Sequence, residues 1–259
     1  MQIQRDLSNI ERQESIRQYV EQKQRVSVQE LSQLFAISLA TARRDLEALS
    51  DQGLVQRIHG GAIAVRKAPP EPPLLHRAQE MAEEKRRIGQ AVANLVLDGE
   101  TIFLGSGTTV SEVALALKER QNLTVITNSL LVLNALFNSP GITIISLGGV
   151  LRTSELSFIG HLTEQALSEV RADKVIIGIR AIDIEAGLTN DYLPETMTDR
   201  AILRIGRQVI IAADHSKCGC TSTAFVASIS AIDVLVTDQA VSRDFVEGLQ
   251  REGIQVILA

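Results

Sequence analysis

The sequence contains few cysteines and histidines, and this scarcity limits its chemistry. Its two cysteines, Cys218 and Cys220, are separated by one residue, which is poor geometry for a mutual disulfide. Two thiolates alone do not complete a zinc site, and the four histidines are scattered along the chain. We therefore expect neither a metal site nor a cofactor.

Long apolar runs are also missing. No segment approaches the roughly 18 to 20 uninterrupted apolar residues of a membrane span, so we expect no membrane partner. The stretch from Met1 to Arg12 is polar and charged, unlike the apolar region of a secretory signal. These features predict a cytoplasmic location.

An excess of positive charge is missing as well, since the net charge is −5. Residues 1–66 contain nine Lys and Arg against eight Asp and Glu, whereas the remainder contains 17 against 23. The acidic excess therefore lies outside the first segment. This distribution permits DNA binding there but does not predict it.

Proline is concentrated in one place. Four of the six prolines fall within residues 69–73, and such a run cannot continue a helix or a central strand. We predict a domain at 1–66, a proline-rich linker at 67–84 and a larger domain at 85–259.

The first segment has the pattern of three helices followed by a hairpin. Serines stand three residues before a glutamate at Ser8 and Ser27, which is capping-box spacing. A third helix is expected over 39–52, and two short strands over 54–65. Two helices joined by a short turn and closed by a hairpin make a winged helix-turn-helix, whose second helix enters the major groove of DNA.

Within the expected recognition helix, Ala42 and Leu46 are assigned to the core. The remaining polar residues then face outward, and two further candidates lie on the wing. The candidate DNA-binding residues are Ser38, Thr41, Arg43, Arg44, Arg57 and His59. The alternative is a three-helix protein-interaction domain with a solvated arginine pair.

The second segment alternates short Val- and Ile-rich strands with helical stretches. This pattern predicts a doubly wound, mostly parallel α/β domain. Strands are expected at 101–104, 124–127, 142–146, 174–179, 208–212, 234–237 and 255–258. Helices are expected at 84–97, 110–118, 129–138, 160–169, 195–206 and 242–251.

A glycine-rich turn follows the first of these strands. Ser106, Gly107, Thr108 and Thr109 would place free backbone N–H groups and hydroxyls at a helix N-terminus, which suits a phosphate. The loop is neither a Walker A motif nor Gly-x-Gly-x-x-Gly, because Val110 stands where the third glycine should be. A tight strand-to-helix turn without a ligand is the equally good alternative.

Other polar residues follow the remaining strands, and open α/β sheets bind ligands at these strand ends. For Asp191 and Glu195 the alternative is helix capping, and for Asp214 and Lys217 it is a polar loop. The further candidates are Lys85, Thr127, Asn128, Ser129, Gly149, Arg152, Asp191, Glu195, Asp214 and Lys217.

The first segment closely resembles the DeoR family of bacterial regulators. The resemblance rests on Thr41-Ala42-Arg43-Arg44-Asp45-Leu46 and His59-Gly60-Gly61-Ala62, supported by Glu11-Arg12, Val28–Leu31 and Leu54-Val55. It implies a DNA-binding repressor, or occasionally an activator, of sugar or nucleoside metabolism genes.

The second segment resembles the sensor domain of the same family. The matching pieces are Lys85, the Gly-Ser-Gly-Thr-Thr loop, Thr127–Ser129, Gly148-Gly149 with Arg152, Glu155–Gly160, Gly187–Thr189 and Ala213–Lys217. That domain is similar in fold to ribose-5-phosphate isomerase and glucosamine-6-phosphate deaminase.

The resemblance implies a phosphorylated sugar or related effector. Its phosphate would lie on the loop, with Lys85 or Lys217 as counter-charge. The chain departs from the common pattern at Gly105, where many members have Asp, at Arg180, where they have a smaller residue, and at Leu193–Thr196 and Cys218. These differences concern the sugar part of the ligand more than its phosphate.

We expect a regulator that binds an operator as a homo-oligomer, because one winged helix covers little DNA. An isomerase or deaminase carrying a DNA-binding domain is the alternative. Its general base could be Asp191, Glu195 or Asp214, although the family's sensor domains generally bind without turnover. A third reading is a nucleotide-binding scaffold, which the helix-turn-helix disfavours.

Overall fold

A computed structural model of the protein describes residues 9–64, 68 and 72–259. The chain separates into two compact units, Met1–Arg66 and Lys67–Ala259. We call them the winged unit and the pocket unit. Most of the predicted proline run, including Pro69 and Pro70, lies outside the described residues, as does the expected cap Ser8.

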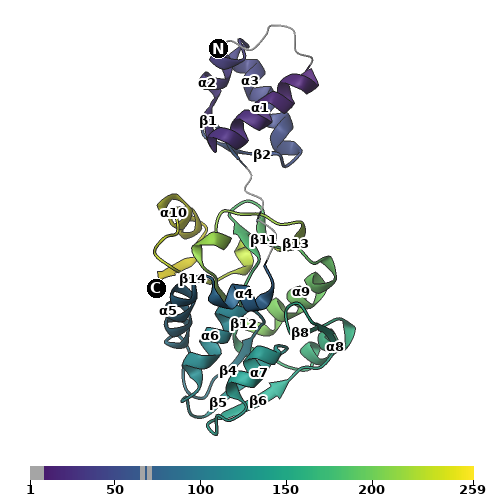
Figure 1. The fold of residues 1–259 in the computed structure, drawn as a ribbon, viewed down its shortest axis with the longest axis vertical. Helices are drawn as coiled ribbons and strands as arrows, with labels where there is room; N and C mark the ends of the chain where they lie inside the picture. The colour runs from purple at the N-terminus through teal and green to yellow at the C-terminus, as the bar shows by residue number, and fades with distance from the viewer. Residues whose placement is uncertain (1–8, 65–67, 69–71) are drawn as a thin grey trace. The chain divides into compact units, whose positions relative to one another are not determined.

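The winged unit consists of three helices and a small antiparallel sheet (Figure 1). The expected hairpin gains a third strand, because the apolar link around Val26 pairs with the far strand of the wing. The side chains of Ile16, Leu31 and Leu46 are fully buried in its core. The elements are α1 (Asn9–Lys23), β1 (Arg25–Ser27), α2 (Val28–Leu34), α3 (Leu39–Asp51), β2 (Val55–Ile58) and β3 (Gly61–Ala64).

Two adjacent glycines shape the wing. Gly60 has φ +84°, which L side chains rarely adopt. At Gly61, a Cβ atom would lie 2.0 Å from the carbonyl oxygen of Val26. The pair therefore allows the hairpin to turn and β1 to approach β3.

The pocket unit is built on a seven-stranded parallel sheet of order β15-β14-β12-β9-β4-β5-β6. Every strand expected from the sequence is present, and the predicted doubly wound, mostly parallel α/β architecture is confirmed. The strands are β4 (Thr101–Leu104), β5 (Leu123–Thr127), β6 (Ile142–Ser146), β9 (Ala172–Ile177), β12 (Gly206–Ala212), β14 (Val234–Thr237) and β15 (Gln255–Leu258).

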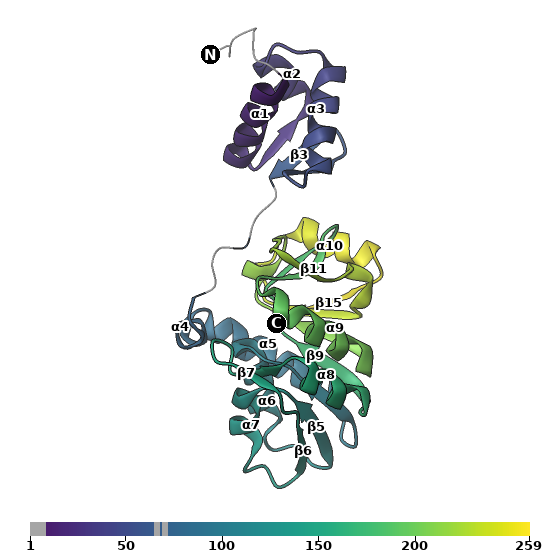
Figure 2. The same cartoon turned by 90° about the vertical axis from the view of Figure 1, so that its right-hand side faces the viewer.

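Helices cover both faces of this sheet (Figure 2). Within β4, Ile102 and Leu104 belong to one apolar core and Phe103 to the other, because successive strand residues point to opposite faces. One face carries α5 (Ala82–Ala93), α6 (Thr108–Leu117) and α7 (Leu130–Leu136), and the other α8 (His161–Ser168), α9 (Thr196–Ile205) and α10 (Arg243–Arg251).

Several elements of the pocket unit were not expected. The predicted linker 67–84 includes helix α4 and the beginning of α5, which belong to the pocket unit. Pro73 stands at the N-cap of α4, a position that needs no backbone N–H donor. The further elements are α4 (Leu74–Gln79), β7 (Val150–Arg152), β8 (Ser157–Ile159), β10 (Ala181–Asp183), β11 (Gly187–Asn190), β13 (Ala224–Ala227) and the 3-10 turns Leu193–Glu195, His215–Lys217 and Ile229–Ala231.

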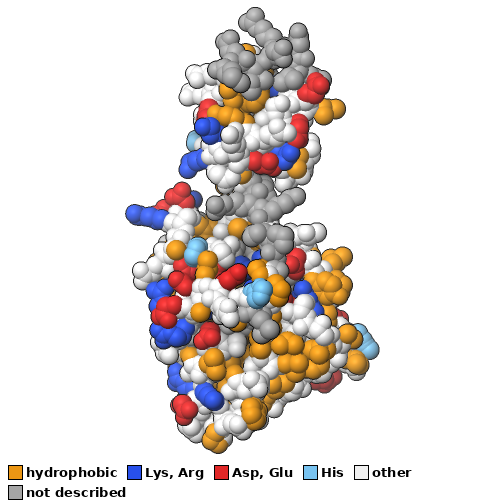
Figure 3. Space-filling view, in the orientation of Figure 1, with side chains coloured by type: hydrophobic (Ala, Val, Ile, Leu, Met, Phe, Trp, Pro, Cys, Tyr) orange, Lys and Arg blue, Asp and Glu red, His pale blue; other side chains and the backbone are white. Residues whose placement is uncertain are grey.

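The surface of the pocket unit has an apolar region over α7, α8 and the edge of the sheet near β6 (Figure 3). Phe137 at the end of α7, Val150 in β7 and Leu162 in α8 are each at least 60% exposed. None of the helices in the described part of the chain has the length and apolar character needed to span a bilayer.

Candidate functional site

Helix α3 presents its polar residues as the sequence predicts. The Ser38 Oγ atom accepts a hydrogen bond from the Thr41 backbone N–H at 3.0 Å and so caps the helix. Arg43 and Arg44 are exposed, while Ala42 is fully buried. The start of α3 therefore offers two solvated guanidinium groups on the surface opposite the core.

The conspicuous Asp45 of this helix has a structural role. It is 2% exposed, and it accepts hydrogen bonds from Arg12 Nε at 2.7 Å and Arg12 Nη2 at 3.0 Å. Gln13 donates a third bond at 3.2 Å. The hydrogen bond to Asp45 raises the pKa of Arg12. This contact fixes α1 against α3 and explains why Asp follows the two exposed arginines.

The two wing candidates differ in exposure. Arg57 lies in β2 and is partly buried, whereas His59 is exposed at the tip of the hairpin beside Gly60. Of these two residues, only His59 is solvent-exposed like the arginines of α3.

A cavity of about 380 Å³ lies at the carboxyl end of the parallel sheet. The chain runs from β4 outward through β5 to β6, and then crosses to the other side of β4 to form β9. The loops after β4 and β9 consequently diverge, which opens a crevice at the topological switch point. The loops after both strands line the cavity, together with Asn128 and Asp214 beyond the neighbouring strands.

The glycine-rich loop forms one wall of this cavity. Gly107 has φ +104° and caps α6 without a side-chain hydrogen bond, so the first backbone N–H groups of α6 have no side-chain acceptor among the described residues. Thr108 and Thr109 are both buried. A Cβ atom on Gly105 would lie 2.9 Å from Ile177 Cγ2, so a larger residue there would require the Ile177 side chain to move.

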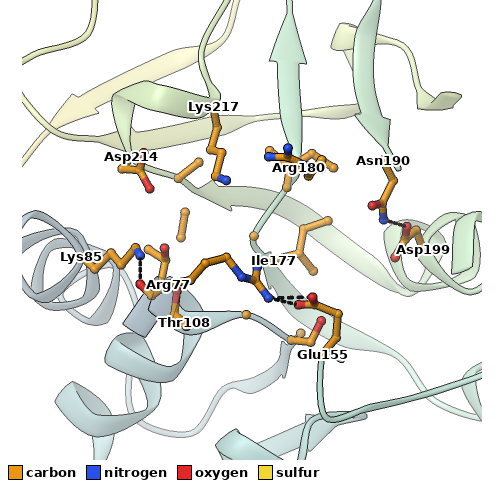
Figure 4. A pocket seen from close by; sticks show the side chains of 18 of the residues that line it. Arg77, Lys85, Thr108, Glu155, Ile177, Arg180, Asn190, Asp199, Asp214 and Lys217 are labelled. Carbon is orange, nitrogen blue, oxygen red and sulfur yellow. Dashed lines mark hydrogen bonds and ion pairs between the residues drawn. The ribbon is translucent and has the colours of Figure 1, made fainter. Parts of the chain in front are cut away.

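Cationic side chains surround this loop (Figure 4). Lys217 points into the cavity, and Arg180 is 6% exposed with its Nε atom 3.5 Å from Asp191 Oδ2. Lys85 is also buried, and its Nζ donates to the carbonyl oxygens of Arg77 and Glu80. Burial lowers the pKa of Lys85.

Acidic groups gather at another part of the cavity. Glu195 forms an ion pair with Arg152 and accepts a hydrogen bond from Ser157. Asp199 accepts one from Asn190 Nδ2 at 3.0 Å. Burial is the main cause that raises the pKa of both carboxyl groups, and the neighbouring Glu195 charge helps raise that of Asp199 to about 7.

The cavity collects ten of the predicted ligand-binding residues. They are Lys85, Ser106, Gly107, Thr108, Thr109, Asn128, Arg152, Glu195, Asp214 and Lys217. Asn128 is 3% exposed, and its Oδ1 atom accepts no hydrogen bond from the described residues, whereas its Nδ2 donates to the Phe158 carbonyl oxygen.

The other four candidates do not line the cavity. Thr127 Oγ1 donates to the Leu104 carbonyl oxygen, and the Ser129 hydroxyl caps α7. Gly149 approaches Thr163 so closely that a Cβ atom would lie 2.1 Å from Thr163 Oγ1. Asp191 is exposed and pairs with two arginines that line the cavity, Arg152 and Arg180.

Sequence reasoning missed Arg77, Asn190 and Asp199, which all line the cavity. Arg77 stood in the expected linker, and its Nη2 atom lies 2.6 Å from both carboxylate oxygens of Glu155. Asp199 lies four residues after Glu195. This spacing places both residues on one helix face and was a weak signal that Asp199 belongs to the site.

The arrangement suits a small polar anion. The N-terminus of α6 and the lysines favour negative charge, while the amide and carboxyl groups can bond hydroxyls. The described residues contain no cluster of three potential metal ligands.

Two family models match the chain, each over one unit. The DeoR-like helix-turn-helix domain matches residues 12–68, and the DeoR C-terminal sensor domain matches residues 80–239. Together with the winged fold and the switch-point cavity, these matches define a DNA-binding transcriptional regulator with a sensor domain. The chain belongs to the DeoR family.

Relatives named as repressors match most of the chain. The transcriptional repressor AccR of Agrobacterium fabrum is 37% identical and covers 89% of this chain and 90% of its own length. The glycerol-3-phosphate regulon repressor of Escherichia coli is 38% identical, covering 90% and 92%. The repressor GlcR of Bacillus subtilis is 34% identical, covering 96% and 95%.

These relatives are regulators, so the alternative of an isomerase or deaminase is not supported. Among solved structures, a ribose 5-phosphate isomerase A from Methanocaldococcus jannaschii shows a distant likeness. It is 16% identical with a TM-score of 0.41, and the match covers 54% of this chain and 55% of that one.

Proposed function

We propose that this regulator represses a carbohydrate-metabolism operon and that a phosphorylated sugar, bound in the switch-point cavity, controls its DNA affinity. Exposed Arg43 and Arg44 would contact base edges or phosphates of the operator, and Ser38 and Thr41 would contact the backbone beside them. His59 and Arg57 would bind DNA from the wing.

The observation that carries the effector proposal is the convergence of Thr108, Thr109 and Lys217 on one cavity. A phosphate placed there would accept hydrogen bonds from the first N–H groups of α6 and from both hydroxyls. Sugar hydroxyls would reach Asn128 Oδ1, which lacks a donor among the described residues. The names of two relatives, a glycerol-3-phosphate regulon repressor and a putative aga operon repressor, support a carbohydrate connection.

A thermal-shift screen tests the effector proposal. The full chain would be melted with ribose 5-phosphate, glucose 6-phosphate, fructose 6-phosphate, glucosamine 6-phosphate and glycerol 3-phosphate, each beside its unphosphorylated parent. A ligand that binds only the folded state raises the melting temperature by mass action. We expect at least one phosphate ester to raise it and its parent to have no effect.

The same compounds would then be added to the protein bound to DNA from upstream of its own gene. We expect the stabilising ester to change the affinity for that DNA. If no ester stabilises the protein, or if turnover of the ester is observed, the effector proposal is wrong.

A further inference from the structure

Helix α4 is the first element of the pocket unit, and it forms part of the cavity wall. It begins at Leu74, eight residues after the winged unit ends at Arg66. Arg77 of α4, with Glu80 and Met81 directly after it, lines the same cavity as the glycine-rich loop. A ligand in the cavity therefore lies beside the segment that leads to the DNA-binding part of the chain.

Two charged contacts hold α4 in place. The Arg77 Nη2 atom lies 2.6 Å from both oxygens of Glu155, a residue between β7 and β8. From the other side, the Lys85 ammonium donates to the carbonyl oxygens of Arg77 and Glu80, at the C-terminal end of α4. Figure 4 shows Arg77, Lys85 and Thr108 together. We call α4 with Arg77, Glu155 and Lys85 the α4 latch.

The turn after α4 has an uncommon backbone conformation. Met81 has φ +51° and ψ +37° and stands at the N-cap of α5. A non-glycine residue in this left-handed region persists when surrounding contacts hold it. The hydrogen bonds of Lys85, four residues further on, span this turn.

We infer that an anion on the glycine-rich loop opens the α4 latch; this inference rests on the proposed anion site. A phosphate beside Thr108 attracts the Arg77 and Lys85 side chains and repels the Glu155 carboxylate. Each cation in the latch then exchanges a contact that holds α4 for a contact with the anion. Occupancy of the cavity thereby loosens the first element of the pocket unit.

Hydrogen exchange on the full-length protein tests the α4 latch. Exchange would be followed in residues 74–81 and, separately, in residues 105–111, in inorganic phosphate and in chloride at matched ionic strength. We expect phosphate to slow exchange in the loop and to speed exchange in α4 several-fold.

The variant Glu155→Gln removes the charge of the latch but keeps the shape of the side chain. We expect α4 to exchange faster in this variant without phosphate and to lose most of its phosphate response. The loop should still be protected, because one negative charge near the anion has been removed. The matched control is Glu83→Gln, which breaks an exposed ion pair with Arg86 on the adjoining helix, and it should behave as the unsubstituted protein.

The two possible failures are distinguishable. If phosphate leaves loop exchange unchanged in the unsubstituted protein, the anion site is wrong and the latch inference falls with it. If the loop is protected while α4 exchange is unchanged or slower, the anion site stands and the latch inference is overturned. An equal α4 response in Glu155→Gln and the unsubstituted protein would also overturn it.

Discussion

Three arginines of the winged unit have different roles because their side chains are packed differently. Arg12 is held by two hydrogen bonds to Asp45, so its charge stabilises the contact between two helices. Arg43 and Arg44 have no ion pair among the described residues and are exposed. Only the latter two retain guanidinium donors that can bind another molecule.

The substitutions Arg43→Ala and Arg44→Ala should therefore weaken specific operator binding. Each lost bidentate base contact costs about 1–3 kcal/mol. Fluorescence anisotropy with operator and scrambled DNA measures the loss. Arg243→Ala, which removes an exposed arginine of α10, is the control. Unchanged affinity in both α3 variants would rule out this helix as the recognition helix.

The acidic part of the cavity predicts a pH dependence of stability. Asp199 has its pKa raised from 3.8 to about 7 by burial, so the folded state holds a proton that the unfolded state releases. The free energy of unfolding should fall as the pH rises from about 4 to 7, and change little from this group above that range.

Asp199→Asn keeps the neutral form at every pH and should flatten this dependence. Denaturant unfolding between pH 5 and pH 8 measures the pH dependence of the free energy of unfolding. The variant should gain stability relative to the unsubstituted protein as the pH rises. Parallel curves for the two proteins would mean that Asp199 is already ionised at pH 5.

At the scale of single elements, the glycine-rich loop and the first turn of α6 are expected to bind the phosphate. Thr108→Glu places a carboxylate where the phosphate would lie, and we expect at least a tenfold loss of sugar-phosphate affinity, or about 1.4 kcal/mol. Operator binding should persist without responding to the effector.

Two matched variants support this measurement. Ser111→Glu adds the same charge to α6 at a residue that does not line the cavity, and it should keep the response. Thr108→Val removes only the hydroxyl. It provides a second test of the site in case the Thr108→Glu variant does not fold. A normal effector response in Thr108→Glu would show that the loop is structural.

The wing gives a second element-scale prediction. Gly61→Ala would bring a methyl group to 2.0 Å from the Val26 carbonyl oxygen, and relief requires β1 and β3 to separate. We expect a destabilisation of about 1–3 kcal/mol, visible as a lower melting temperature of the winged unit. Gly148→Ala, where a Cβ atom meets nothing within 4 Å, is the control and should melt normally.

Helices and strands with a periodic apolar pattern could be predicted from the sequence, whereas contacts between residues distant in sequence could not. The strand around Phe103 is apolar on both faces, and this local pattern is enough to identify a buried parallel strand. Helix α4 lacks such a signal, because it has only six residues and follows a proline run. Its assignment depends on partners distant in sequence, such as Glu155.

The site shows the same division. The loop at Thr108 could be recognised because strand, glycines and helix are consecutive in the sequence. The spacing of Asp199 from Glu195 was a weak signal, but its environment could not be predicted, since it comes from Asn190 in a short strand pair with no strong sequence pattern. The roles of Thr127 and Ser129 were likewise hidden, because polar residues at strand ends serve caps as readily as ligands.

At the scale of the whole molecule, we predict a homo-oligomer. One winged unit reads a short stretch of DNA, and useful specificity requires two half-sites. Closed symmetric assemblies are the common solution. Light scattering at micromolar concentration should give a multiple of the chain mass of 28.2 kDa. A monomer, both alone and on operator DNA, would contradict this prediction.

The position of β4 between β5 and β9 also sets an order of events during synthesis. Strand β5 follows β4 closely along the chain, whereas β9, the other partner of β4, begins only at Ala172. The winged unit leaves the ribosome first and has its own apolar core. At about 5–20 residues per second, roughly 10–40 seconds separate its completion from that of the pocket unit. During that interval, a newborn chain can contain a folded DNA-binding unit before its switch-point cavity exists.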